Sequence, residues 1–160
     1  VVKKFPNAVC VVVGDGADMS RLKGLIIKLN IQKNIIFAGW QQDLSRYYSG
    51  ADVFVNSSLY EGYAMTLVEA GSLGCPIITT PVGIARDICH DGQNAFVCPV
   101  GDTECFARCT VDLLSSPDKR ELFKNQMRDT IKGIRTTKDM YIATYIELLR
   151  NTIIRYSHQS

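Results

Sequence analysis

The sequence has few histidines, little net charge and no long apolar run. Two of its 160 residues are histidine, and the formal net charge is +2 at pH 7. A charge this close to neutral gives no strong field that would attract nucleic acid, so no nucleic-acid partner is expected. The N-terminal stretch "VVKKFPNAVCVVV" ends at "GDG" and is too short for a signal peptide or a membrane span.

The cysteines form no CxxC pair and lie in apolar surroundings, at positions Cys10, Cys75, Cys89, Cys98, Cys105 and Cys109. A chain of this size can fold without cross-links, so free buried thiols in a reducing cytoplasm are expected rather than disulfides. Two of the thiols, Cys105 and Cys109, are four residues apart on an expected helix. Two thiolates do not complete the tetrahedral site that zinc takes, so no metal site is expected.

The composition is typical of one soluble globular domain, with 46% apolar and 21% charged residues. A chain of this length can bury roughly two-thirds of its unfolded surface. We expect a single domain over residues 1–160, with a helical C-terminal extension over about 117–156. The chain begins without Met, as a fragment of a longer protein would.

Short β-branched runs alternate with helical periods along the chain. Strands are predicted at 8–14, 33–39, 52–58, 75–81 and 94–100, and helices at 18–30, 43–51, 64–73 and 102–116. Asp18 is the predicted N-cap of the first helix. Because the strands are apolar throughout and separated by helices, they predict an α/β fold, a doubly wound, Rossmann-like parallel sheet.

The loops that follow the strands are the predicted location of any ligand. In sheets of this kind ligands bind outside the carboxyl ends of the strands. The loops concerned are 14–18, 38–43, 56–64, 79–86 and 99–102, and all five are expected at one edge of the sheet.

The stretch "VVVGDGADM" is similar to a dinucleotide fingerprint, but the third glycine position is Met19 and no acidic residue closes the strand "NIIFAG". Binding of NAD is therefore disfavoured. The alternative is a glycine turn at Gly14 and Gly16 that lets the backbone approach a helix N-terminus.

Two glutamates bracket the start of the helix predicted from Ala64. The backbone N–H groups of about residues 62–66 would face an anionic or hydroxyl-rich ligand, with Glu61 at the mouth of the helix. Glu69 lies more than a turn inside, and its two oxygens suit a vicinal diol such as a ribose. The alternative is that Glu61 only complements the helix dipole and Glu69 is a solvated helix residue.

The motifs "VVVGDGAD", "FAGW", "ADVFVNSSLYEGYAMTLVEAGSLGCPIITTPVG" and "DGQNAFVCPVGD" carry a family resemblance. Together they resemble the C-terminal, donor-binding domain of retaining nucleotide-sugar glycosyltransferases of the GT-B fold, group 1 or family 4 type. The resemblance covers roughly residues 8–115 and includes an E-x7-E pattern from Glu61 to Glu69.

The resemblance implies a role for each site residue. Glu61 lies against the donor hexose and is the catalytic candidate, Glu69 takes the ribose hydroxyls, and the backbone of "GYAMT" meets the hexose and the diphosphate. A plain packing role for Trp40 is the alternative to a place beside the base. The implied donor-binding residues are Gly14, Gly16, Ala38, Gly39, Trp40, Leu44, Gly62, Tyr63, Ala64, Met65, Thr66 and Glu69.

By the same resemblance the donor is a UDP- or GDP-sugar or a related molecule, bound without a metal or other cofactor. The implied reaction is retaining transfer of the sugar to a glycan or lipid-linked acceptor in polysaccharide biosynthesis. Two alternatives stay open, a nucleotide-sugar 2-epimerase of the same architecture and a non-catalytic interaction module. The expected location is the cytoplasm, with the inner face of a membrane as a peripheral site.

This chain departs from the family pattern at Ala64, where glycine is frequent, and at "IARD" (84–87), where Gly-x-Pro-Glu is frequent. In the family, an Arg and a Lys that neutralise the diphosphate precede the point where this chain begins, and an N-terminal domain binds the acceptor. We therefore expect that domain as a missing partner and expect this fragment alone to be inactive.

The helix predicted after Pro117 has a basic stripe opposite an apolar face. A solvated surface is the favoured interpretation, with weak contact to anionic lipid as the alternative. The later run "MYIATYIELLRNTIIRY" is apolar enough to pack on another domain. His90, in "CHDGQN", is treated as a polar surface residue. The stripe consists of Arg120, Lys124, Arg128, Lys132 and Arg135, and the apolar face of Phe123, Met127, Ile131 and Ile134.

Overall fold

The computed structural model describes residues 1–134 of the chain. The strands are β1 (Cys10–Val13), β2 (Ile35–Gly39), β3 (Phe54–Asn56), β4 (Ile77–Thr79) and β5 (Ala95–Val97). The α-helices are α1 (Met19–Lys28), α2 (Ser45–Gly50), α3 (Met65–Leu73), α4 (Ala85–Ile88), α5 (Thr103–Ser115) and α6 (Pro117–Ile134). Each predicted strand and helix of the first 116 residues is present. The short α4 and a 3-10 turn, η1 (Gln32–Asn34), were not predicted.

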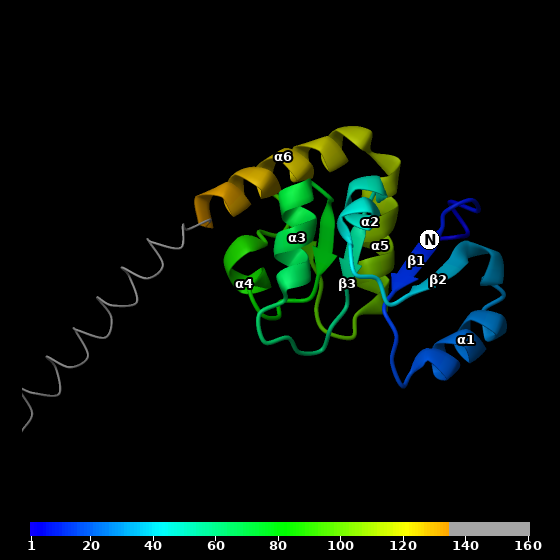
Figure 1. Ribbon diagram of the computed structural model, residues 1–160. Coiled ribbons are helices and arrows are strands. Elements are labelled where there is room, and N and C mark those ends of the chain that lie inside the picture. Colours follow the sequence, from blue (N-terminus) through cyan, green and yellow to red (C-terminus); the bar gives the residue numbers. More distant parts are fainter. Residues whose placement is uncertain (135–160) are drawn as a thin grey trace, which may run out of the picture.

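All strand pairs among the described residues are parallel, which confirms the predicted α/β class. Cys10 lies opposite Ile35 in the β1–β2 pair, and Ile77 lies opposite both Phe54 and Ala95 in the order β3–β4–β5. The ladder is divided, however, into a sheet of two strands and a sheet of three. Figure 1 shows β1, β2 and α1 to one side of the layer formed by β3–β5 and its helices.

The β3–β5 sheet has a core on each face because neighbouring residues of a strand point to opposite sides. Ile77 belongs to the cluster built with α3, α4 and the second half of α6, whereas Ile78 belongs to the cluster built with α5. Both isoleucines are fully buried. Helix α6 contributes Phe123 to one cluster and Met127 to the other, so it connects the two layers, as its path along the top of Figure 1 shows.

Strand β1 is more exposed than its apolar sequence predicted. The side chains of Val9 and Val11 are 53% and 43% exposed, and Cys10 is exposed as well. The prediction of a buried strand is therefore wrong for the described residues: β1 has one strand neighbour, and α1 buries none of its own residues. Asp18 does stand at the N-cap of α1, but its carboxylate pairs with Arg21 and accepts no backbone N–H.

The cysteines only partly follow the prediction of free buried thiols. Cys75 and Cys89 are buried and free, and burial raises the pKa of each thiol to about 12. Cys98 and Cys105, in contrast, are joined in a disulfide. The prediction missed this pair because the turn between β5 and α5 folds back and brings their Cα atoms to 5.7 Å, within the range that a disulfide spans.

The basic stripe of α6 is not simply a solvated face. Arg120 donates to the carbonyl oxygen of Leu113 at 2.7 Å, and Arg128 donates to that of Leu73 at 3.0 Å. Both arginines are half-buried, so they bind the ends of α5 and α3 to α6. Lys132 is exposed and pairs with Asp129. Arg135 and the run at 140–156, with the rest of the predicted extension, lie outside the described residues.

No helix within residues 1–134 combines the length and the apolar character that a bilayer crossing requires.

Candidate functional site

The loop between β3 and α3 is fixed by side-chain hydrogen bonds. Asn56, the last residue of β3, accepts from the backbone N–H of Ser58 at 3.2 Å. The Ser58 hydroxyl donates to Glu61 Oε1 at 2.7 Å, and Thr80 donates to the Ser58 carbonyl oxygen at 2.7 Å. Glu61 is half-buried. Its carboxylate is therefore held at the start of α3 while its second oxygen remains available to a ligand.

The start of α3 presents backbone donors. Ala64, the N-cap residue, has φ +69°, a left-handed conformation that glycine adopts more easily. This explains physically why a glycine suits the position. Among the hydrogen bonds of residues 1–134, none uses a backbone N–H of residues 62–66 as the donor, and α3 has no side-chain cap. These groups can bind an anion or hydroxyls.

A second loop, after β4, packs directly on the first. The N–H of Ile84 donates to the Tyr63 carbonyl oxygen at 2.8 Å. Gly83 has φ +52°, and a Cβ added there would meet that same oxygen at 2.5 Å. The two loops thus approach so closely that only glycine fits at position 83.

The two loops enclose a cavity of about 670 Å³ at the carboxyl ends of the strands. Three of the predicted site residues, Glu61, Gly62 and Tyr63, line it. The sequence did list the loop 79–86 as a ligand loop, but it assigned no residue there to a site. The other lining residues are Leu59, Tyr60, Val82, Gly83, Ile84, Arg86, Asp87, Ile88 and Ile134.

Two oppositely charged residues, Arg86 and Asp87, also line this cavity. Arg86 and Asp87 are both exposed, and Arg86 donates from Nε to the Pro81 carbonyl oxygen at 2.9 Å. The guanidinium keeps its other N–H groups for a ligand. His90 is exposed, as predicted, and is not among the lining residues.

Glu69 lies apart from this cavity, on an exposed part of α3. Its Oε2 accepts from the hydroxyl of buried Tyr48 at 3.3 Å. Burial and then the negative charge of Glu69 raise the pKa of Tyr48, so the phenol stays protonated and continues to donate. Glu69 is thus a positioned carboxylate rather than a freely rotating one.

We expect Tyr48→Phe to lower the free energy of unfolding by about 0.5 to 1.5 kcal/mol, the usual net contribution of one hydrogen bond. The ring of Tyr48 also packs edge-on against Phe54, and phenylalanine keeps that contact. Urea denaturation measures the change. Tyr47→Phe is the matched control because no hydrogen bond of the Tyr47 hydroxyl occurs among the described residues, and an equal loss in both variants would contradict the assignment.

The remaining predicted residues lie around the ends of β1, β2 and α3. Gly14 donates from its N–H to the Gly39 carbonyl oxygen at 2.7 Å, which joins the ends of β1 and β2. Trp40 is 73% exposed, which argues against a core packing role. Leu44 packs against the core cluster of α3 and precedes α2. The others are Gly16 in the turn before α1, Ala38 in β2, exposed Met65 and half-buried Thr66 in α3.

The loops carrying these residues are spread over both sheets. Figure 1 shows the loop after β1 and the loop from β3 to α3 at the same lower side of the molecule. None of the residues at the ends of β1 and β2 lines the 670 Å³ cavity. The predicted set therefore includes one group around Glu61 and a second group around Gly14, Gly39 and Trp40.

A family model described as glycosyl transferases group 1 matches residues 1–130. Among curated proteins, the chain is 27% identical over 148 residues to the lipopolysaccharide core biosynthesis glycosyltransferase LpsE of Rhizobium meliloti (strain 1021), covering 92% of this chain and 43% of that protein. It is 28% identical over 150 residues to an Escherichia coli UDP-Gal:alpha-D-GlcNAc-diphosphoundecaprenol alpha-1,3-galactosyltransferase, covering 92% and 39%. The chain thus spans less than half the length of these relatives.

Solved structures share the fold. TarM superposes with a TM-score of 0.84 at 19% identity, over 92% of this chain and 30% of TarM. Anabaena Alr3699/HepE, solved in complex with UDP, superposes with a TM-score of 0.76 at 18% identity, over 94% and 42%. These likenesses confirm the fold, one half of the GT-B architecture.

Proposed function

Because the chain belongs to the group 1 glycosyltransferase family, we propose that it is the donor-binding part of a sugar-transferring enzyme and that its ligand is a nucleoside-diphosphate sugar. The observation that carries this proposal is the cavity at the start of α3, where Glu61 stands beside backbone N–H groups without partners in the described chain. Such a site offers acceptors for sugar hydroxyls and donors for phosphate oxygens within one cavity.

In this proposal Glu61 accepts hydroxyls of the hexose, and the N–H groups of 62–66 face the diphosphate. As the bond to the anomeric carbon breaks, negative charge grows on the departing diphosphate, and N–H groups already in place stabilise it. Ser58 holds Glu61 in position at 2.7 Å. We propose that transfer proceeds with retention and that the acceptor attacks from the face on which the diphosphate departs.

Glu69 is proposed to bind the ribose. It is exposed yet positioned by Tyr48, and a carboxylate with two free acceptor directions suits a vicinal diol. The base would then lie toward the ends of β1 and β2, where Trp40 is exposed and no atom lies within 4 Å of the Cβ positions of Gly14 and Gly39. A UDP complex of the similar fold in Alr3699/HepE is consistent with such a ligand.

The separation of the strands into two sheets supports the proposal that the chain is part of a longer enzyme. In the doubly wound strand order 3-2-1-4-5-6, the first strand stands between the second and the fourth. If β1 and β2 correspond to strands two and three, β3–β5 correspond to four, five and six. Within residues 1–134, β1 pairs only with β2 and β3 pairs only with β4. In this correspondence no described strand lies between β1 and β3, where strand one of the doubly wound order would be. We propose that an upstream strand fills it and that an N-terminal domain supplies the acceptor site.

The experiment that tests donor binding is a thermal-shift screen of the 160-residue chain with UDP, GDP, ADP and their sugars. A ligand that binds only the folded state raises Tm. At a ligand concentration 100 times Kd, it increases the free energy of unfolding by about 2.7 kcal/mol. We expect a rise with UDP- or GDP-sugars. No rise with any nucleotide would favour a non-catalytic interaction module, and acceptor-free epimerisation by the longer protein would favour the 2-epimerase.

The proposed contacts use carboxylates, backbone N–H groups and no metal. We therefore expect the same Tm increase in the presence of EDTA. Loss of the increase with EDTA, and its return with Mg²⁺ or Mn²⁺, would reassign Glu61 or Glu69 as a metal ligand.

We propose that the protein is located in the cytoplasm. The alternative is a peripheral location, in which it makes weak contact with the inner face of a membrane.

A further inference from the structure

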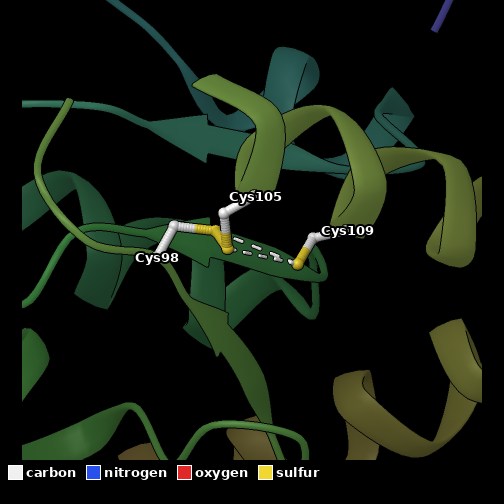
Figure 2. A group of neighbouring side chains, drawn as sticks. All are labelled: Cys98, Cys105 and Cys109. Carbon is white, nitrogen blue, oxygen red and sulfur yellow. Dashed lines mark hydrogen bonds between the residues drawn. A yellow bond between two sulfur atoms is a disulfide. The ribbon is translucent and has the colours of Figure 1, made fainter. Parts of the chain in front are cut away.

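Three cysteines meet in the core away from the proposed donor cavity. Cys98 follows β5, whereas Cys105 and Cys109 lie one turn apart on α5. Figure 2 shows the three side chains converging from these two elements. The three sulfur atoms lie within 4.8 Å of one another, and each cysteine is buried. None of the three residues lines the cavity at Glu61.

Local structure fixes this convergence. Asp102 caps α5 by accepting from the N–H of Cys105 at 2.9 Å, which sets the direction of the helix. The N–H of Cys98 donates to the carbonyl oxygen of Thr79 on β4 at 2.8 Å. The i, i+4 spacing then places Cys109 on the same face of α5 as Cys105. Both backbone anchors are independent of the sulfur atoms.

We propose that the reduced form of this cluster binds one Cu(I) ion through the thiolates of Cys98, Cys105 and Cys109. The sulfur of Cys109 lies 3.9 Å from that of Cys98 and 3.9 Å from that of Cys105. A metal–sulfur bond of about 2.3 Å places two sulfurs on one ion roughly 3.8 to 4.0 Å apart. Two of the three edges of a thiolate triangle are therefore already present.

The composition of the cluster selects the ion. Thiolates favour soft ions such as Cu(I) and zinc, but zinc takes four ligands in structural sites. Among residues 1–134 the group contains three cysteines and no histidine, aspartate or glutamate. All three cysteines are at most 8% exposed, so bulk water has little access as a fourth ligand. A three-coordinate ion fits this set better than a tetrahedral one.

Binding requires the Cys98–Cys105 disulfide to open. A dithiol reductant such as dithiothreitol supplies two electrons and two protons, which gives two thiols, and the reductant itself becomes a cyclic disulfide. The three thiols then lose their protons to solvent as three Cu–S bonds form. Because the sulfurs of Cys98 and Cys105 cannot be bonded to each other and bind the ion as thiolates at the same time, the disulfide and the Cu(I) complex exclude each other.

The test is an anaerobic titration of the reduced 160-residue chain with Cu(I), in competition with the chelator bicinchoninate. We expect one ion per chain, and Cys109→Ala should weaken its affinity by about 100-fold or more, because even changes outside the ligand shell cost 10- to 100-fold. Cys10→Ser is the matched control: this exposed cysteine lies outside the cluster, and its variant should bind as the wild type does.

X-ray absorption at the copper edge gives a readout on the wild-type chain that no folding defect of a variant can affect. We expect three sulfur neighbours. Two sulfurs, equal affinity in wild type and Cys109→Ala, or loss of tight binding in Cys10→Ser would each overturn the proposal. A melting curve without copper checks that Cys109→Ala is folded. If it is not, the absorption spectrum decides alone.

Discussion

Replacing Gly83 by alanine is expected to destabilise the chain strongly and to abolish ligand binding at the Glu61 cavity. At φ +52° the new methyl group would lie 2.5 Å from the Tyr63 carbonyl oxygen and 2.8 Å from its carbon. A left-handed alanine costs about 1 to 2 kcal/mol, and overpacking adds about 1 to 3 kcal/mol. We expect the free energy of unfolding to fall by roughly 2 to 5 kcal/mol in total.

The loss at Gly83 should extend to function because the same contact aligns the two loops of the cavity. Separating them would break the 2.8 Å hydrogen bond from Ile84 to Tyr63 and move the N–H groups at the start of α3. Urea denaturation and the thermal-shift screen measure the two effects. Gly62→Ala is the control for stability alone, because it lies on the facing loop between β3 and α3 and has open space around its Cβ position, although it also lines the cavity. Equal free energies of unfolding for the two variants would show that the loops move apart to accept the methyl group, which would contradict the prediction.

The order of strands and helices was predictable because periodicity and turn residues are local properties. β-branched runs bounded by glycine and proline predicted each strand, and the left-handed turn at Gly74 ends α3 as its glycine indicates. The exposure of β1 was not predictable in this way. Apolar residues such as Val9 and Val11 indicate burial only if a neighbour covers them, and that neighbour is not a local feature of the sequence.

The candidate site was predictable in its chemistry and incomplete in its geometry. The glycine turn and the position of Glu61 before α3 follow from local sequence, and the structure holds them together. The sequence placed the β4 loop among the ligand loops but assigned no site residue to it, because Arg86 and Asp87 line the Glu61 cavity only through the close approach of the two loops at Gly83. The sequence distinguished "IARD" only as a departure from the family pattern, which indicates no role for either residue.

The cysteine cluster was likewise only partly predictable from local sequence. Helical spacing placed Cys105 and Cys109 on one face, and this is what the structure has. The third member, Cys98, comes from the preceding strand end, and its approach depends on the turn capped by Asp102. The prediction that no metal site forms considered only two thiols, whereas the fold brings three cysteines together.

The two glutamates should differ in which part of the donor they affect. Glu69→Gln keeps the size of the side chain but removes the charge proposed to accept the ribose hydroxyls. We expect it to weaken binding of the free nucleotide by about 1.5 to 3 kcal/mol, the range for a hydrogen bond to a charged group, with the fold intact. Because Glu69 lies outside the Glu61 cavity, this variant also tests whether the ligand extends beyond that cavity.

For Glu61→Gln we expect a loss of similar size for the nucleotide sugar and almost none for the free nucleotide, because its proposed partner is the hexose. Calorimetric titration of each variant with both ligands gives the four dissociation constants. Glu104→Gln, an exposed carboxylate in the first turn of α5, is the control for a general effect of charge. If Glu61→Gln weakened both ligands equally, Glu61 would act on the nucleotide or on the loop itself, and the assignment to the hexose would be wrong.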